Sequence, residues 1–150
     1  MKAKLFILVA VFFSGVVAKA QNSNMLFALN RDTTAYITRL VEQKAQYLNK
    51  PISNLLTNLK IPVVDYASTI FDDRPRATDV KGVYLVFYSD EQESVFINQK
   101  KSVPTSILVD FSPPVPKATA LAIRKKYPTG TDGLIELFGQ CIITDIELVK

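Results

Sequence analysis

The stretch Val83-Tyr84-Leu85-Val86-Phe87-Tyr88 is apolar or aromatic at every position and directly follows Gly82. Successive side chains of a strand point to opposite faces of a sheet. A run without polar interruptions therefore predicts a central strand that is buried on both faces. The polar segment before it, residues 70–81, is expected to form a loop that ends at Gly82.

Further strands are expected on both sides of this run. They are predicted at residues 63–68, 94–99, 105–111 and 140–149. Segment 94–99 follows a polar turn and is expected to return as a hairpin partner of the central strand. In segment 105–111, Ile107, Val109 and Phe111 lie on one face and Ser106 and Asp110 on the other, which indicates one buried face. The proline-rich segment 112–116 is expected to be a rigid connector, neither strand nor helix interior.

Helical periodicity occurs on both sides of the strands. Asp32 is a candidate N-cap for a first helix that ends at Lys50, before Pro51. Pro51 suits the start of a second helix, over residues 52–59. A third helix is predicted over residues 117–127, with Ala118, Leu121 and Ala122 turned inward. Residues 134–138 fit either a helical turn or a strand.

This order of elements predicts the fold class. Strands in the middle of the chain and helices at its flanks favour an α+β fold over alternating α/β units. We expect an antiparallel sheet of about four to five strands, with the two N-terminal helices and the later helix packed on it. The strand order does not follow from the pattern.

The N-terminus has the three parts of a secretory signal peptide. Lys2 and Lys4 precede the apolar run 5–13, and Ala18-Lys19-Ala20 presents small residues before Gln21. Residues 1–20 are therefore expected to be a leader cleaved after Ala20, and residues 21–150 to form one compact domain. The alternative, an N-terminal membrane anchor, needs about 20 apolar residues, and this run is shorter.

Export and charge balance restrict the partners. The leader end resembles those of bacterial exported proteins and favours a Gram-negative periplasm or the medium. The chain has 18 basic and 14 acidic residues, and cleavage removes Lys2, Lys4 and Lys19, so the mature net charge is about +1. Such a balanced chain has no overall signature of nucleic-acid binding. We expect no membrane span in the mature chain.

Missing residue types exclude several chemistries. The chain has no histidine, which removes Ser-His-Asp and Cys-His catalysis and histidine-based zinc or haem sites. Its one cysteine, Cys141, lies beside two isoleucines and is expected to be a buried structural thiol, with a reactive thiol as the alternative. No phosphate-binding glycine motif is present. We expect no cofactor, no metal and no catalytic residue.

One kind of catalysis remains chemically allowed. Paired carboxylates of the glycosidase type would need two acidic side chains roughly 5 to 10 Å apart. The candidates are Asp65, Asp72, Asp73, Asp110, Glu136 and Asp145. Because the sequence does not bring any two of them together, a carboxylate-dependent hydrolase is kept only as an alternative function.

Two candidate binding sites stand out. Asp72, Asp73, Arg74 and Arg76 surround Pro75 in the expected loop, which is a stiff, charged segment suited to protein contacts. The alternative is a solvated loop without function. Tyr84, Tyr88 and Phe96 are candidates for a ligand pocket between sheet and helices, and ordinary core packing is the alternative.

The leading hypothesis for function comes from these exclusions. An exported, compact chain without catalytic residues is expected to be an interaction module that binds a protein partner, for example as an inhibitor or immunity-type protein. A sheet edge that can accept a strand would supply the contact. The second hypothesis is a small-ligand-binding periplasmic protein. The sequence does not identify the partner, the ligand or the oligomeric state.

Overall fold

A computed structural model describes residues 32–69, 79–98, 105–128 and 130–149. The chain divides into two compact units, Met1–Asp32 and Thr33–Lys150. The helices and strands discussed below belong to the second unit. The expected leader and the charged loop of Asp72, Asp73, Arg74 and Arg76 lie outside the described residues.

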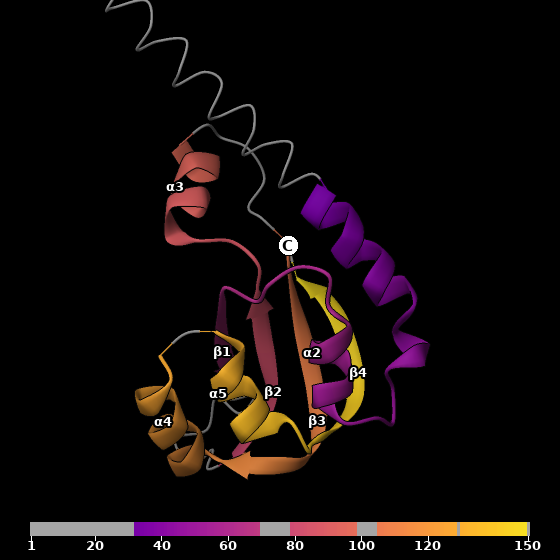
Figure 1. Cartoon of the computed structure of the whole chain (residues 1–150), viewed down its shortest axis with the longest axis vertical. Coiled ribbons are helices and arrows are strands. Elements are labelled where there is room, and N and C mark those ends of the chain that lie inside the picture. Colours follow the sequence, from indigo (N-terminus) through magenta and orange to yellow (C-terminus); the bar gives the residue numbers. More distant parts are fainter. Residues whose placement is uncertain (1–31, 70–78, 99–104, 129, 150) are drawn as a thin grey trace, which may run out of the picture. The chain divides into compact units, whose positions relative to one another are not determined.

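The described strands form a four-stranded antiparallel sheet, which confirms the α+β fold (Figure 1). The strands are β1 (Asp65–Thr69), β2 (Asp79–Val86), β3 (Ser106–Pro116) and β4 (Ile142–Val149). They lie in chain order, so each strand pairs with the one before it. β2 and β3 are the central strands, and β1 and β4 form the outer edges.

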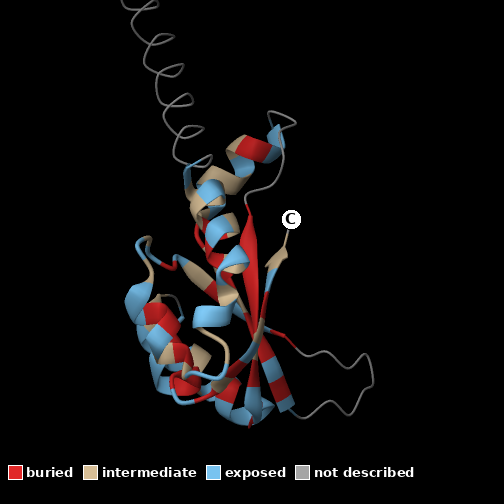
Figure 2. Ribbon diagram, turned by 90° about the vertical axis from the view of Figure 1, so that its right-hand side faces the viewer, coloured by how far each residue is buried: buried red, intermediate tan, exposed pale blue. Residues whose placement is uncertain are grey.

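Helices of the second unit pack on one face of this sheet (Figures 1 and 2). They are the helical residues 33–42, the 3-10 turn η1 (Lys44–Gln46), α2 (Ile52–Asn58), α4 (Lys117–Lys126) and α5 (Thr131–Phe138). Alternate strand residues such as Val83, Leu85 and Val109 are fully buried beneath them. Among the described residues, none of the helices has the length and apolar character needed to cross a bilayer.

The central strand differs in detail from its prediction. β2 starts at Asp79 and runs through Gly82, where its register against β3 shifts. Gly82 therefore lies inside the strand instead of ending a loop. Val83 and Leu85 are buried, but Tyr84 is only half-buried, so the strand is not covered equally on both faces. Tyrosine suits a half-buried position because its ring is apolar while its hydroxyl group can contact water.

The expected strand at 94–99 is wrong, because its described residues, 94–98, belong to helix α3 (Asp90–Asn98). Ser89 and Gln92 form a reciprocal capping box: Ser89 N–H donates to Gln92 Oε1 (2.8 Å), and Gln92 N–H donates to Ser89 Oγ (3.4 Å). Acidic residues in the first turn suit the helix dipole. The Ser-x-x-Gln spacing was readable in the sequence and outweighs the β-branched residues that follow.

Two other boundaries differ from the prediction. The first helix ends at residue 42 instead of 50, because the chain turns through η1 and Asn49, whose φ of 61° is left-handed. β3 continues through the expected connector 112–116, across a cis Ser112-Pro113 bond. Its prolines are exposed, and pairing with β2 resumes with Val115 opposite Val80 and Pro116 opposite Asp79.

The later helices also differ from expectation. Residues 134–138 are helical, as part of α5. In α4, Ala118, Leu121 and Ala122 are exposed, and only Ala120 is fully buried. The inward stripe is Ala120, Ile123, Arg124 and Tyr127, at the i, i+3, i+4, i+7 spacing of a helical face. The helix is therefore rotated, and this rotation places Arg124 against the sheet.

Candidate functional site

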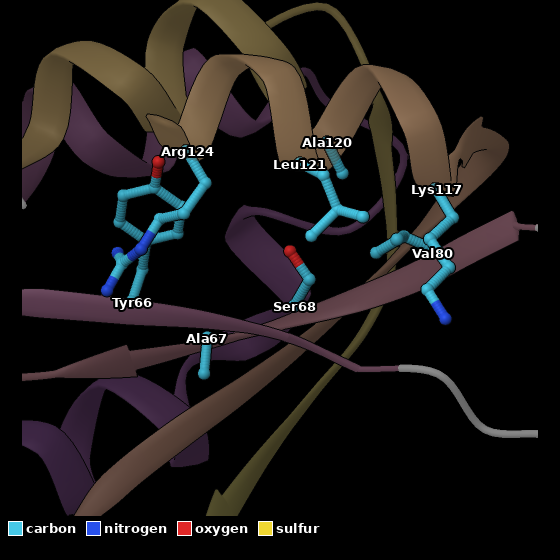
Figure 3. A pocket seen from close by; sticks show the side chains of 8 residues that line it. All are labelled: Tyr66, Ala67, Ser68, Val80, Lys117, Ala120, Leu121 and Arg124. Carbon is cyan, nitrogen blue, oxygen red and sulfur yellow. The ribbon is translucent and has the colours of Figure 1, made fainter. Parts of the chain in front are cut away.

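A groove of about 240 Å³ lies between α4 and the edge strand β1 (Figure 3). It is lined by Tyr66, Ala67, Ser68, Val80, Lys117, Ala120, Leu121 and Arg124. Small and apolar side chains form most of this lining, and a cation stands at each end. In Figure 3, α4 runs beside β1 with Lys117 and Arg124 at opposite ends of the view.

The Arg124 end of the groove is closed by a set of packed polar contacts. The guanidinium lies over the Tyr66 ring, 4.4 Å from its centroid, and Nη2 pairs with Asp65 Oδ1 at 2.8 Å. Tyr66 Oη donates to the carbonyl of Tyr127 (3.1 Å). A Cβ on Gly133 would lie 2.6 Å from Tyr66 Oη, so only glycine leaves room for this ring. The contacts hold β1, α4 and α5 together.

The outer edge of β1 carries free backbone groups. Val64 N–H donates to the Val86 carbonyl (2.8 Å), so Val86 directs its carbonyl toward β1. The N–H and C=O groups of successive residues point to opposite sides of a strand. The backbone groups of Tyr84, two residues before Val86, therefore also point toward β1 and meet those of its partner Ala67. Tyr66 and Ser68 then direct their N–H and C=O groups outward. Tyr66 N–H donates to Asp65 Oδ1 (2.7 Å), and outside the strand ladder no backbone hydrogen bond involves Ser68 within the described residues.

The other end of the groove combines an exposed apolar residue with a lysine that has no ion pair among the described residues. Leu121 is 60% exposed, above a floor that includes buried Val80 and Ala120. Figure 3 shows the side chains of Ser68 and Leu121 pointing toward each other, while Ala67 points away from α4. Lys117 is exposed and forms no ion pair within the described part of the chain. This end can therefore accept both an apolar and an anionic group.

The expected pocket residues lie elsewhere. Tyr84 is half-buried in β2, Tyr88 follows that strand, and Phe96 is buried in α3. None of the three lines the groove. Burial raises the pKa of Tyr88, and Glu93 raises it further, so its phenol stays protonated at neutral pH. The Asp72–Arg76 loop lies outside the described residues, so that prediction stays open.

Two of the candidate carboxylates do come together. Asp110 of β3 lies opposite Asp145 of β4. Burial raises the pKa of Asp110, as do Glu147 and Asp145, and its Oδ1 is buried without a hydrogen bond. The hydrogen bond from Lys44 lowers the pKa of Asp145. Opposed shifts of this kind also occur in acid–base pairs.

The contacts of Asp145 indicate a structural role for this pair. Lys44 Nζ and Ile146 N–H both donate to the same oxygen, Asp145 Oδ1, at 2.5 and 2.8 Å. Lys44 also donates to the Ile146 carbonyl (3.3 Å). The carboxylate therefore fastens Lys44 to β4. Among the described residues, no group of three or more His, Cys, Asp or Glu is placed to hold a metal ion.

Cys141 is buried, 7% exposed, at the entrance to β4. Burial raises the pKa of its thiol, which lowers the fraction of reactive thiolate. The expected burial is confirmed.

The groove between β1 and α4 was not predicted from the sequence. Leu121 had been expected to point inward, on an incorrect helix face, and neither Lys117 nor Arg124 had been named as a site residue. The stripe from Ala120 to Tyr127 in the sequence was the signal for the correct face. No signal in the sequence showed that β1 would be an edge strand, because strand order depends on tertiary pairing. Comparison with known proteins adds no assignment, since no family model, curated protein or solved structure matches the chain.

Proposed function

We propose that this chain is an exported, non-catalytic interaction module that binds an extended segment of a partner protein along the outer edge of β1, beside α4. The observation that carries the proposal is the register of β1 on β2, which directs the N–H and C=O of Ser68 outward beside the groove, away from β2. A guest strand can satisfy both groups while its side chains enter the groove.

The proposal follows from how such edges bind. In strand addition, main-chain hydrogen bonds supply affinity, and pockets for alternate side chains supply specificity. Folded proteins normally cover or charge their edges, because a bare edge is a template for pairing with other chains. β1 is short, and Asp65 occupies one of its outward donors. The outward N–H and C=O of Ser68 therefore remain available to a guest strand, next to the groove.

The size of the groove favours a chain segment over a small ligand. Small-molecule pockets enclose roughly 300 to 1,000 Å³, whereas this groove is open along β1 and measures about 240 Å³. An extended peptide needs less enclosure, since the strand edge itself supplies part of the contact. Export, inferred from Lys2 to Ala20, would place the partner in the periplasm or outside the cell.

The proposal can be tested with a pair of substitutions at one position. Ser68→Pro removes the outward N–H without removing a ladder hydrogen bond to β2, a position where edge strands tolerate proline. Ser68→Ala keeps the N–H and is the matched control. Tagged wild-type and variant proteins are crosslinked in cells and their partners identified by mass spectrometry. We expect one partner whose capture falls at least about ten-fold in Ser68→Pro, the loss of about 1.4 kcal/mol, and stays unchanged in Ser68→Ala.

Further measurements keep the test decisive. Urea unfolding should show that Ser68→Pro is folded, and Ser68→Lys, which places a charge on the edge, replaces it if it is not. Equal capture by all variants would contradict strand addition. Light scattering gives the oligomeric state. A wild-type dimer that becomes a monomer in Ser68→Pro would mean that a second copy of this chain occupies the edge, and would also overturn the proposal.

A further inference from the structure

The spacing of two α4 residues matches the spacing of side chains on a strand. Lys117 and Leu121 both line the groove and lie one helical turn apart, about 6 Å along the helix axis. Side chains on the same face of a strand are two residues apart, about 6.7 Å. Because α4 runs beside β1 (Figure 3), a guest strand on β1 can place one side chain at each of these residues.

The charge of Lys117 indicates what one of these guest side chains should be. Arg124 is paired with Asp65 and Lys126 with Glu136, whereas Lys117 has no ion pair among the described residues. Lys117 is also the first residue of α4, where the helix dipole disfavours a cation. Its position is therefore not explained by helix stability. A carboxylate from a guest would neutralise it.

The outward direction of the Ser68 N–H and C=O groups determines how a guest strand aligns with β1. The guest residue opposite Ser68 exchanges both backbone hydrogen bonds with it, in the antiparallel manner of every other pair in this sheet. Its side chain lies on the same face as that of Ser68, which points toward Leu121. Since Leu121 is exposed and apolar, this guest position suits an aliphatic side chain.

We propose that the groove selects an extended segment with the order acidic, any residue, aliphatic, running antiparallel to β1. The aliphatic residue pairs with Ser68 beneath Leu121, and the acidic residue, two positions earlier, pairs with Lys117. Pairing ends at Tyr66, whose N–H is already bound by Asp65. This inference rests on the proposed function and names the partner's chemistry.

The experiment is a selection from a displayed library of short random peptides against the purified mature protein. The variants are Lys117→Glu, which reverses the groove charge, and Lys125→Glu, which makes the same charge change on exposed α4 surface outside the groove. Ser68→Pro and Ser68→Ala identify peptides that bind through the strand edge. Selected peptides are then measured by fluorescence polarisation.

We expect the wild type and Lys125→Glu to enrich an acidic residue two positions before an aliphatic one. Lys117→Glu should bind these peptides about five-fold more weakly, as for loss of one rim ion pair, and should enrich a basic residue at the same position. Edge-dependent peptides without an acidic preference would overturn this inference but leave strand addition intact. The absence of any peptide that depends on Ser68 N–H would contradict the proposed function itself, and this inference with it.

Discussion

The two outer edges of the sheet differ in how the rest of the chain treats them. Beside β4, Asn49 N–H donates to the Ile143 carbonyl, and Ile143 N–H donates to the Lys50 carbonyl, each at 2.9 Å. Farther along β4, Lys44 Nζ donates a hydrogen bond to the Ile146 carbonyl. Beside β1, the only comparable contact in the described residues is the side chain of Asp65 on Tyr66 N–H. One edge is closed by backbone, and the other is left open.

The difference shows that this sequence is able to protect a strand edge. The left-handed Asn49 and the bridge from Pro51 to Ile142 bring the chain alongside β4. No equivalent segment covers β1 within the described residues, although its edge stands beside a groove and an unpaired lysine. An edge of this kind is a binding site in strand addition and an aggregation risk otherwise. Three measurements test whether the two edges differ in this way.

The largest difference is expected in amide hydrogen exchange. Ile143 N–H is bonded within the closed edge and should open only with global unfolding, whereas Ser68 N–H faces outward. We expect the Ser68 amide to exchange at least about a thousand-fold faster, because global stabilities of 5 kcal/mol or more correspond to such factors. Exchange read by NMR provides the comparison. Similar protection at both residues would mean that the β1 edge is already covered.

A smaller difference is expected in stability. Ile143 is fully buried, so Ile143→Ala removes core packing at the closed edge and should lower the free energy of unfolding by about 2–5 kcal/mol. Ser68→Ala at the open edge should change it by less than about 0.5 kcal/mol. Urea unfolding at constant pH measures both. A large loss in Ser68→Ala would show that the open edge supports the fold.

The smallest effect concerns the ion pair that fastens Lys44 over β4. The folded-state pKa of Asp145 is lowered, chiefly by the hydrogen bond from Lys44. Its stabilisation is therefore present above the ordinary carboxyl pKa and lost as pH falls through the folded value. Both side chains are more than a third exposed, so Asp145→Asn should cost less than about 1 kcal/mol near neutral pH.

The pH dependence provides the control for this prediction. The difference in unfolding free energy between wild type and Asp145→Asn should be present at about pH 7 and shrink as the pH falls below the ordinary carboxyl pKa and through the lowered folded-state pKa. Glu147→Gln makes the same charge change at an exposed neighbour that forms no ion pair in the described chain. A pH-independent loss in Asp145→Asn would indicate that packing at this residue matters more than its charge.

Sequence patterns predicted the elements whose burial follows a simple period. The second helix, with Ile52, Leu55 and Leu56 buried, and the strand from Ile142 were expected within a few residues. Segment 94–99 was predicted wrongly as a strand because it follows a polar turn, and that prediction took no account of the capping box of Ser89 and Gln92. Here a local hydrogen-bonding signal, present in the sequence, should have decided the assignment.

The groove required information from distant parts of the chain. Its two sides, β1 and α4, are separated by two strands and a helix in the sequence. The face of α4 that packs inward depends on Tyr66, whose ring holds Arg124 and whose hydroxyl bonds to Tyr127. The predicted pocket of Tyr84, Tyr88 and Phe96 relied on residue type alone, which does not tell which face of the sheet the helices cover.

Composition and local periodicity were enough to predict the α+β class, the burial of Cys141 and the lack of histidine chemistry. The three-dimensional structure was needed to show that the described residues leave the edge of β1 open, that residues 49–50 and Lys44 bond along the edge of β4, and that Lys117 and Leu121 line the same groove as Ser68. Strand order and helix rotation depend on packing and backbone pairing between segments that are distant in the sequence. The hydrophobic periodicity within one segment does not show which distant segment it will contact.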